Sequence, residues 1–431
     1  MFEDFIYPFT FGDRTQSDLL GGKGANLAEM VRIGLPVPPG FTITTHACRE
    51  YLSTNTVPEG LTEQIEKALV DLEKSLGKKF GDAANPLLVS VRSGAKFSMP
   101  GMMETVLNVG MTPEVAESMA IQTGNPRFAW DSYRRFIDMY GRIVCDISPD
   151  EFHKTESRVL SSFGISSIQE LDVMGLQALA DGYIKTTEAV TGLPFPTNPV
   201  DHLMRSIEAV FRSWNSERAQ LYRRRERIPS DLGTAVNIQS MVFGNLSDDS
   251  GTGVAFTRDP ATGEKGSYGD YLERAQGEDV VAGIRNTISL VEFGEKSPVV
   301  HAELERVMTL LEDHYRDLCD IEFTVEKGKL WILQTRVGKR TAEAAFRIAT
   351  QLVDEGKISM DEALVRTSGD QLAQLMFPQF DLAGSVTAIA TGIPASPGAA
   401  VGEVVFDSRR AFDLARSGKK VIFGASRNKS G

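Results

Sequence analysis

Residues 319–336 constrain the fold of this chain more than any other stretch, because polar and apolar side chains alternate along them. The polar positions are Asp320, Glu322 and Thr324, and the apolar positions are Ile321, Phe323 and Val325. A period of two is typical of a β-strand whose faces differ in character. A second apolar run follows the Lys327-Gly328 pair, so the segment predicts a β-hairpin.

The turn of this hairpin can be built in two ways. A two-residue Lys327-Gly328 loop would require Lys327 at positive φ, which is unfavourable for lysine, and would put Gln334 on the face opposite Glu322. A three-residue loop over 326–328 needs only Gly328 in the left-handed conformation and sets Gln334 opposite Asp320. We expect the three-residue loop.

Asp320 and Glu322 put two carboxylates on one face of the predicted strand, where they repel each other unless a cation lies between them. Mg²⁺ binds one or two carboxylates together with phosphate oxygens, so it is the natural candidate. The alternative is a solvated edge hairpin whose acids only prevent aggregation. The hairpin by itself favours neither interpretation.

The whole chain, 431 residues long, has room for about three domains. Its net charge of -12 argues against general nucleic-acid binding, because phosphate backbones require clustered cations. The three scattered cysteines form no CxxC pair, so they predict neither a disulfide framework nor a zinc site. Acidic first residues and the lack of a long apolar run predict no signal peptide and no membrane span. We therefore expect a cytoplasmic protein.

Residues 20–34 predict a glycine-rich turn that opens a short helix closed by Gly34. Lys23 lies beside the open backbone amides of that turn, which suit phosphate. Because Gly24 follows the lysine, the segment is not a P-loop. A closely packed turn with a surface lysine is the simpler interpretation.

Residues 87–103 predict a buried strand that runs into a loop of small residues. Arg92 and Lys96 lie at the end of this strand, where Arg92 can donate two hydrogen bonds to phosphate oxygens. The loop from Ser98 to Gly101 is placed to close over a nucleotide.

Residues 234–243 and 251–257 predict β-strands on either side of a polar turn. A strand edge with free backbone groups can recognise adenine. The candidates for this contact are Gln239, Met241 and Val242. Downstream, AQGEDVVAGIR, which contains Glu278, precedes small residues that we expect to form a second wall beside the phosphates.

Helical spacing of apolar residues extends from about Thr112 to Ile207 and predicts a largely helical region. Residues 340–355 predict an amphipathic helix, and Ser359 with Glu362 predicts a capping box for the next one. From residue 385 a small β-rich module begins, but its few large apolar side chains do not predict a complete core.

Taken together, the motifs of the chain resemble those of the pyruvate, phosphate dikinase family. They are GGKGANLAEM, SVRSGAKFSMPGMMETVLNVG, MVFGN, SGTGVAFTRDPATGE, AQGEDVVAGIR, DIEFT, LQTR and GIPASPGAAVG. They occur in the family's order over nearly all of residues 5–405. The SMPGMMETVLN run and the helical insertion after it resemble the dikinase more than the related phosphoenolpyruvate synthase.

The resemblance implies an α+β fold in which the two lobes of an ATP-grasp domain clamp Mg-ATP. The implied domains are a first lobe (1–111), a helical insertion (112–198), a second lobe (199–339), a helical linker (340–384) and the incomplete, β-rich start of a phosphohistidine domain (385–431).

The resemblance also implies roles for individual residues. Lys23 and Arg92 would hold phosphates from the first lobe. The second lobe would hold metal, ribose and phosphates through Asp320, Glu322 and Gln334, with Mg²⁺ on the two acids. Arg92 and Arg336 would act in catalysis. To the ATP-binding set we add Ser98, Gly101, Gln239, Met241, Val242 and Glu278.

Family members pass the β-phosphoryl group of ATP to a histidine on a mobile domain, and then use phosphate and pyruvate to form phosphoenolpyruvate, AMP and pyrophosphate. That histidine lies beyond GIPASPGAAVG in a Thr-Ser-His-Ala context, which this sequence does not contain before Gly431. His46 has the most similar neighbours, but it follows a first-lobe strand, where the family has no acceptor.

We therefore expect the ATP-binding, phosphoryl-donating part of a dikinase, acting with a phosphohistidine domain in cis or in trans. A homodimer remains open. The alternative is a non-catalytic nucleotide-sensing or partner-binding module with the same fold.

Overall fold

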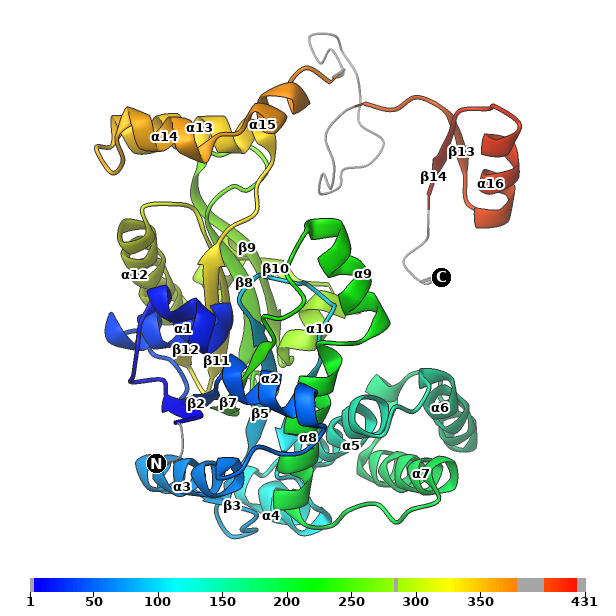
Figure 1. Cartoon of the computed structure of the whole chain (residues 1–431). Helices are drawn as coiled ribbons and strands as arrows, with labels where there is room; N and C mark the ends of the chain where they lie inside the picture. The colour runs from blue at the N-terminus through cyan, green and yellow to red at the C-terminus, as the bar shows by residue number, and fades with distance from the viewer. Residues whose placement is uncertain (1–3, 283–285, 378–398, 425–431) are drawn as a thin grey trace. The chain divides into compact units, whose positions relative to one another are not determined.

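The computed structural model describes residues 4–282, 286–377 and 399–424 (Figure 1). The chain divides into two compact units. Unit 1 consists of Met1–Ala255, Gly269–Val307 and Asp320–Arg336, and unit 2 consists of Phe256–Tyr268, Met308–Cys319 and Val337–Gly431. Helices and antiparallel sheets both contribute, so the expected α+β class is confirmed.

Figure 1 carries the labels used below. The strands are β1 (Ile6–Pro8), β2 (Gly40–Ile43), β3 (Lys79–Phe80), β4 (Pro86–Leu87), β5 (Val89–Ala95), β6 (Thr105–Val109), β7 (Thr234–Ser240), β8 (Gly251–Arg258), β9 (Lys265–Glu273), β10 (Ile288–Ser289), β11 (Cys319–Glu326), β12 (Lys329–Val337), β13 (Glu403–Val405) and β14 (Val421–Phe423). The α-helices are α1 (Ser17–Arg32), α2 (Thr45–Thr54), α3 (Leu61–Leu76), α4 (Pro113–Thr123), α5 (Pro126–Met139), α6 (Pro149–Phe163), α7 (Val173–Thr191), α8 (Pro199–Ser213), α9 (Glu217–Glu226), α10 (Gly277–Ala282), α11 (Leu290–Lys296), α12 (Pro298–Tyr315), α13 (Ala342–Asp354), α14 (Met360–Arg366), α15 (Gly369–Gln374) and α16 (Ser408–Arg416). Shorter helical turns are η1 (Arg14–Gln16), η2 (Tyr140–Val144) and η3 (Ile168–Glu170).

An antiparallel sheet with strand order β1-β2-β7-β5-β6 forms the centre of unit 1. Every residue of β7 is buried, because β2 and β5 pair with its two edges. The register places Asn237 beside Thr42 on one side and beside Arg92 on the other. Helices α1 and α8 both pack against β5 and β7, so the sheet fixes the position of α1 relative to Arg92.

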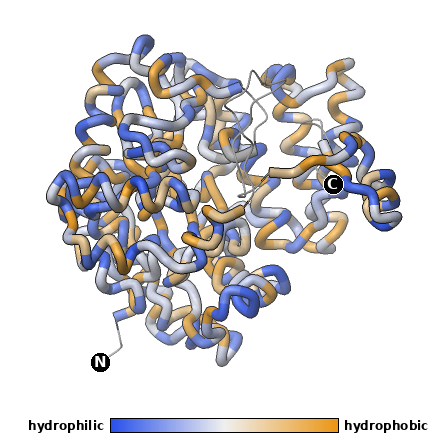
Figure 2. The backbone as a smooth tube through the Cα atoms, turned by 90° about the horizontal axis from the view of Figure 1, so that it is seen from above, coloured by the Kyte–Doolittle hydropathy of each residue, from blue (hydrophilic) through white to orange (hydrophobic). Residues whose placement is uncertain are grey.

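The region from about Thr112 to Ile207 is largely helical, as expected. Helices α4, α5, α6 and α8 each begin with a capping side chain followed by proline, and the caps are Thr112, Asn125, Ser148 and Asn198. The cap accepts a backbone N–H, and proline has no N–H to leave unbonded in the first turn. Short local signals in the sequence therefore set where these helices start. Hydrophilic and hydrophobic positions alternate along the helical coils of the backbone in Figure 2.

A second sheet has the strand order β10-β9-β8-β11-β12. The hairpin between β11 and β12 is present, but the expected three-residue loop is wrong. The loop consists of Lys327 and Gly328 alone, at φ values of 49° and 71°, as in a type I′ turn.

Hydrogen bonds with residues 243–250 explain why Lys327 can adopt the left-handed conformation, which costs about 1–2 kcal/mol. The backbone N–H of Lys327 donates to Ser250 Oγ at 3.0 Å, and that of Gly328 donates to the Asp249 carbonyl at 3.1 Å. Glu326 accepts the N–H of Phe243 at 2.6 Å. These bonds are long-range, and the hairpin sequence alone does not reveal them.

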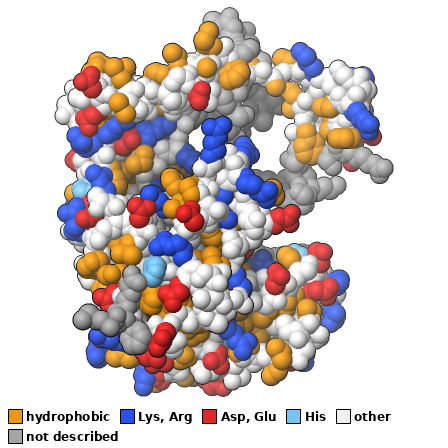
Figure 3. All heavy atoms as spheres, viewed as in Figure 1, with side chains coloured by type: hydrophobic (Ala, Val, Ile, Leu, Met, Phe, Trp, Pro, Cys, Tyr) orange, Lys and Arg blue, Asp and Glu red, His pale blue; other side chains and the backbone are white. Residues whose placement is uncertain are grey.

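Helix α13 carries the core of unit 2. Ile348 and Leu352 pack with Leu318 from before β11 and with Ile358 after the helix. The predicted capping box is confirmed, since Ser359 and Glu362 bond each other's backbone N–H groups at the start of α14. The outer face of α14 exposes large apolar side chains, which are visible over this helix in Figure 3. Among the described residues, no helix combines the length and apolar character needed to cross a membrane.

Residues 399–424 contain β13, α16 and β14, with the two strands parallel. The expectation of a β-rich start is therefore only partly right, because a helix connects the strands. Val405 and Ala411 are buried, whereas Phe406 and Phe412 are largely exposed. Among the described residues of this segment, few apolar side chains are buried. The rest of the predicted 385–431 module lies outside the described residues.

Candidate functional site

Helix α1 carries Lys23 past the end of β5, and a break at Gly21 makes this possible. Gly21 has φ 66° and ψ 167°, and a Cβ placed there would lie 1.5 Å from the Gly94 carbonyl oxygen. Only glycine allows such an approach. The interpretation of the turn as a close-packing device is therefore right, although the glycine break lies inside α1 and does not open it.

Lys23 is not a plain surface lysine, because other charged groups surround it. Part of its side chain reaches solvent, yet burial lowers the pKa of Lys23 to about 7. The positive charges of Arg92 and Arg336 lower it further, and the negative charge of Glu322 opposes them. A lysine whose pKa is lowered this strongly by burial and by cationic neighbours is typical of a site that binds an anion.

Glu322 is the point where strands distant in the sequence meet. Arg92 of β5 donates through Nη2 to Glu322 Oε2 at 3.3 Å, and its Nη1 lies 3.5 Å from Gln239 Oε1. Gln334 of β12 donates through Nε2 to Glu322 Oε1 at 3.3 Å. The structure thus brings these predicted residues together within unit 1, and their binding of a ligand remains a prediction.

Gln334 reaches Glu322 despite the two-residue turn because β12 is irregular. The buried residues of β12 are Leu330, Ile332 and Thr335. The spacing between buried residues is therefore two residues at first and then three, so the alternation of faces shifts by one residue between Ile332 and Thr335. Strict alternation would have turned Gln334 toward the buried face. The slip leaves it beside Glu322.

Asp320 forms the second acidic position of the site. Arg336 contacts Asp320 Oδ2 through both Nε and Nη2 at 2.7 Å. Burial raises the pKa of Asp320, and its pairing with Arg336 only partly offsets this effect. Asp320 and Thr324 are both buried, and of the three polar residues on this face of β11 only Glu322 is partly exposed, so the alternative of a solvated edge hairpin is wrong.

The charges of this cluster suit a metal-bound polyphosphate. Three cations, Lys23, Arg92 and Arg336, surround the acids Asp320 and Glu322. In the part of the chain that the structure describes, no group of three or more His, Cys, Asp or Glu side chains is arranged to hold a metal ion. Two carboxylates that leave further ligand positions to phosphate oxygens are the usual protein contribution to Mg²⁺. The residues present therefore fit Mg²⁺ carried by a nucleotide.

The prediction that residues 234–243 offer a free sheet edge is wrong. β7 is the central strand, and Gln239 pairs with Gly40 on one side and with Ser90 on the other. Its amide points toward Arg92 and donates to the Pro38 carbonyl. Met241 and Val242 follow the end of β7 and are half-buried, and the N–H of Met241 donates to Leu88.

The remaining predicted contacts lie on loops or outside the described side chains. Ser98 and Gly101 are exposed in the loop between β5 and β6, and Gly101 has φ 70° after Pro100, as in a type II turn. Lys96 at the start of this loop pairs with Asp18 of α1 at 2.5 Å. Glu278 belongs to α10, and its side chain lies outside the described residues.

Sequence reasoning missed Asn237, which lies behind the cluster. Its Oδ1 accepts from Thr42 Oγ1 at 3.0 Å, and its Nδ2 lies 3.5 Å from the Arg92 carbonyl. A Cβ at Gly94 would lie 2.5 Å from that Nδ2. The side chain thus joins β2, β7 and β5 under the backbone that carries Arg92. The available signal was an asparagine inside the otherwise apolar run TAVNI.

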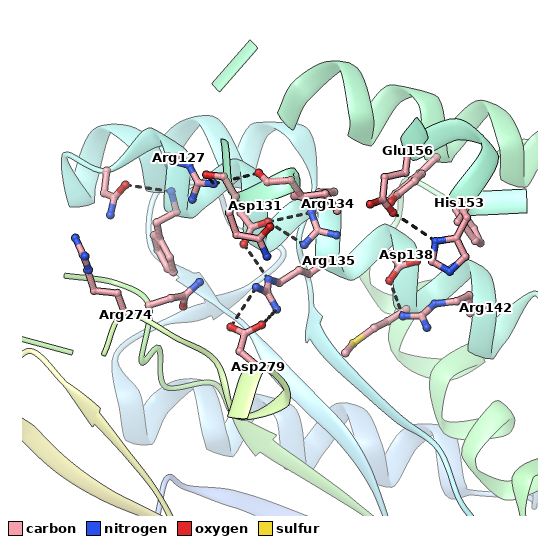
Figure 4. Close-up of a pocket in the computed structure, with 18 of the residues that line it drawn as sticks. Arg127, Asp131, Arg134, Arg135, Asp138, Arg142, His153, Glu156, Arg274 and Asp279 are labelled. Atoms are coloured by element: carbon pink, nitrogen blue, oxygen red, sulfur yellow. Dashed lines mark hydrogen bonds and ion pairs between the residues drawn. The ribbon is translucent and has the colours of Figure 1, made fainter. Parts of the chain in front are cut away.

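A cavity of unit 1, about 830 Å³, lies elsewhere, between α5–α7 and the segments around 245–248 and 274–279 (Figure 4). Asp131 bonds both Arg134 and Arg135, and Arg135 also pairs with Asp279 at 2.9 Å. Burial opposes ionisation of Asp131, but the two arginines outweigh it and hold its pKa well below the usual range.

This cavity is lined by five arginines and five acids. Arg142 pairs with Asp138, Arg274 pairs with Asp248, and Arg127 donates to backbone carbonyls of 168–171. Because its charges balance, the cavity offers no cationic excess to a triphosphate. The Lys23–Arg92–Glu322 cluster does.

Comparison with known proteins identifies the family. The family model described as "Pyruvate phosphate dikinase, AMP/ATP-binding domain" matches residues 17–64, 57–303 and 300–357. The chain is 49% identical over 424 residues to pyruvate, phosphate dikinase of Clostridium symbiosum, which covers 97% of this chain and 48% of that protein. The enzyme of Rhizobium meliloti is 48% identical, and this match also covers 97% of this chain and 48% of that enzyme. The enzyme of Giardia intestinalis is 48% identical over 94% of this chain and 46% of that enzyme.

The chain therefore spans about half the length of the curated relatives it matches. The family match includes all the residues of the charged cluster. The chain belongs to the pyruvate, phosphate dikinase family and corresponds to its AMP/ATP-binding portion.

Proposed function

We propose that the chain binds Mg-ATP at the Lys23–Arg92–Glu322 cluster, as the two lobes of an ATP-grasp domain, and donates a phosphoryl group. The 3.3 Å contact between Arg92 and Glu322 is the observation that supports this most directly, because it joins residues 230 positions apart in the sequence. Members of the cluster come from α1, β5, β11 and β12, and one phosphate chain can touch them all. The domain boundaries at 111, 198, 339 and 384 belong to the same proposal.

Each residue of the cluster has a separate task. Lys23 and Arg92 neutralise phosphate oxygens, and Arg336 is placed to compensate charge that develops as the phosphoryl group leaves. Asp320 and Glu322 would hold Mg²⁺, which supplies Lewis-acid neutralisation of the phosphates. Gln334 and Gln239 orient Glu322 and Arg92 by hydrogen bonds.

The receiving group in this proposal is a histidine on a phosphohistidine domain, reached in cis or in trans. The whole reaction would then convert ATP, pyruvate and phosphate into AMP, phosphoenolpyruvate and pyrophosphate in the cytosol.

Transfer in trans tests the proposal. The chain is mixed with a separately expressed phosphohistidine domain, Mg²⁺, inorganic phosphate and ATP labelled at the β-phosphorus. We expect label on the domain's histidine and its loss with Glu322→Gln. Glu343→Gln, an exposed acid on α13, is the matched control and should transfer normally.

Two results would count against the proposal. Transfer that persists in Glu322→Gln would place the site elsewhere. Tight Mg-ATP binding without any transfer would favour a nucleotide-sensing module.

A further inference from the structure

Unit 2 has a cavity of about 520 Å³ that shares no residue with the charged cluster of unit 1. Its mouth carries three cations, Lys339, Arg340 and Arg366, and one acid, Asp317. The cavity is therefore cationic in a chain whose net charge is -12. A cationic hollow on an acidic protein selects for anions by local charge.

Asp317 organises the two arginines without using all their donors. Arg340 donates through Nη1 to Asp317 Oδ1 at 2.5 Å and through Nε to the Gly338 carbonyl at 3.2 Å. Arg366 lies 3.7 Å from Asp317 Oδ2 and donates through the same Nη1 to the Arg316 carbonyl at 2.5 Å. A guanidinium has five N–H donors, so each arginine keeps donors for a further acceptor.

Lys339 adds a cation that the protein does not neutralise. Its side chain is exposed, and within the described ranges it makes no ion pair. Arg340 and Arg366, in contrast, are largely buried, with 15% and 28% of their side chains exposed. Two fixed guanidinium groups and one mobile ammonium are a typical arrangement for binding a phosphate or carboxylate.

The inner wall of the cavity is apolar. Val337, which is 46% exposed, lines it together with side chains of α13 that are already buried in the core of unit 2. Small-molecule sites combine such an apolar lining with a few converging polar groups, in volumes of roughly 300–1,000 Å³. A bare inorganic anion would leave the exposed side chain of Val337 uncovered.

We propose that this cavity is a binding site for a small organic anion, whose phosphate or carboxylate head meets Lys339, Arg340 and Arg366 and whose apolar body covers Val337. Gln371 at the rim can donate to a hydroxyl or carbonyl group of the ligand. The site is separate from the proposed ATP site in residues and in unit, so one can be occupied while the other is empty.

Phenyl phosphate is a suitable probe, because it combines both halves of the proposed ligand. Its dissociation constant is measured by calorimetry on the full chain carrying Lys23→Ala, which weakens phosphate binding at the ATP cluster. We expect saturable one-site binding that is at least tenfold tighter than binding of inorganic phosphate. Lys339→Ala and Arg366→Gln should each weaken it at least fivefold. Lys78→Ala, an exposed lysine elsewhere, should change nothing.

Equal affinity for phenyl phosphate and inorganic phosphate would contradict the apolar half of the site. Unchanged affinity in Lys339→Ala and in Arg366→Gln would overturn the site itself. Lys339 is exposed, so its variant tests the site even if Arg366→Gln folds poorly. Competition by phenol alone, without its phosphate, would likewise exclude the anion requirement. If Lys23→Ala leaves Mg-ATP binding unchanged, the ATP proposal fails, whereas the comparison of Lys339→Ala and Arg366→Gln with Lys78→Ala still tests the site in unit 2.

Discussion

At the scale of single residues, the approach of α1 to β5 rests on two glycines, Gly21 and Gly94. Their backbones are so close that a methyl group at position 21 would overlap the Gly94 carbonyl. The two glycines also fix the positions of Lys23 and Arg92. Lys23 lies on α1 just beyond Gly21, and Arg92 lies on β5 just before Gly94. The backbone contact therefore sets the separation of the two cations.

Gly21→Ala should lower the free energy of unfolding by about 3 kcal/mol and weaken Mg-ATP binding, because α1 must move away from β5. Urea denaturation and calorimetry would measure the two effects. Gly34→Ala is the matched control, since Gly34 has φ 82° but nothing within 4 Å of its missing Cβ. It should cost only about 1 kcal/mol of conformational strain and leave binding intact. Equal losses in the two variants would contradict the contact.

Lys327→Asn should stabilise the protein by about 0.5–1 kcal/mol, because asparagine tolerates the left-handed conformation better than lysine and Asn-Gly suits a type I′ turn. Chemical denaturation would show the gain. Lys78→Asn, an exposed lysine outside the left-handed region, should give no such gain. Destabilisation by Lys327→Asn would contradict the two-residue turn.

At the scale of secondary-structure elements, unit 2 is held by a buried ionic network between β8, α12 and α13. Arg258 is fully buried and contacts Glu312 at 2.7 Å and Glu355 at 2.9 Å. Burial opposes ionisation of Glu355, yet hydrogen bonds from Arg258 and Lys265 outweigh it and lower its pKa to about 2. The ionised form of Glu355 is thus favoured by folding.

A group whose pKa is lowered on folding contributes stability above its unfolded pKa, near 4.5, and loses it as the pH falls toward 2. Glu355→Gln should therefore cost about 2 kcal/mol at pH 7, and its difference from the parent chain should shrink between pH 4.5 and 2. Urea titrations across this range measure the difference. For Glu343→Gln, an exposed acid paired with Arg347, we expect less than about 0.5 kcal/mol. A difference for Glu355→Gln that does not vary with pH would contradict the network.

The helices and strands also show how much of the fold local sequence signals can predict. The helical spacing of apolar residues predicted the helical region between 112 and 207, because this signal acts within a few residues, as do the cap-proline pairs that start its helices in the structure. The position of β7 could not be predicted, since its partners β2 and β5 are roughly 150–200 residues away and nothing in TAVNIQS distinguishes an edge strand from a central one. The hairpin turn failed for the same reason, because Ser250 and Asp249 stabilise it from another part of the chain.

The candidate site was more predictable than the strands around it. Lys23, Arg92, Asp320 and Glu322 were candidates by charge and position, but only the resemblance to the dikinase family implied that they share one site, and the structure brings them together. Asn237 was not predicted, because its role depends on the pairing of three strands. The family resemblance thus indicated which residues meet, and strand order decides what lies behind them.

At the scale of the whole molecule, ligand binding should stabilise the native state. Saturation of the cluster at a hundredfold excess of Mg-ATP over its dissociation constant should add about 2.7 kcal/mol to the free energy of unfolding. Thermal denaturation with Mg-ATP, ATP plus chelator, and Mg²⁺ alone separates the contributions. We expect the full shift with Mg-ATP only, and an equal shift without the metal would contradict a role for Asp320 and Glu322.

Unit 1 contains two candidate nucleotide sites. One is the Lys23–Arg92–Glu322 cluster, and the other is the arginine-lined cavity shown in Figure 4. The most direct measurement is the dissociation constant of Mg-ATP, by calorimetry, for Glu322→Gln and for Arg135→Gln in the cavity. We predict at least tenfold weaker binding in Glu322→Gln and an unchanged constant in Arg135→Gln. The reverse result, with binding lost only in Arg135→Gln, would contradict the assignment of ATP to the cluster.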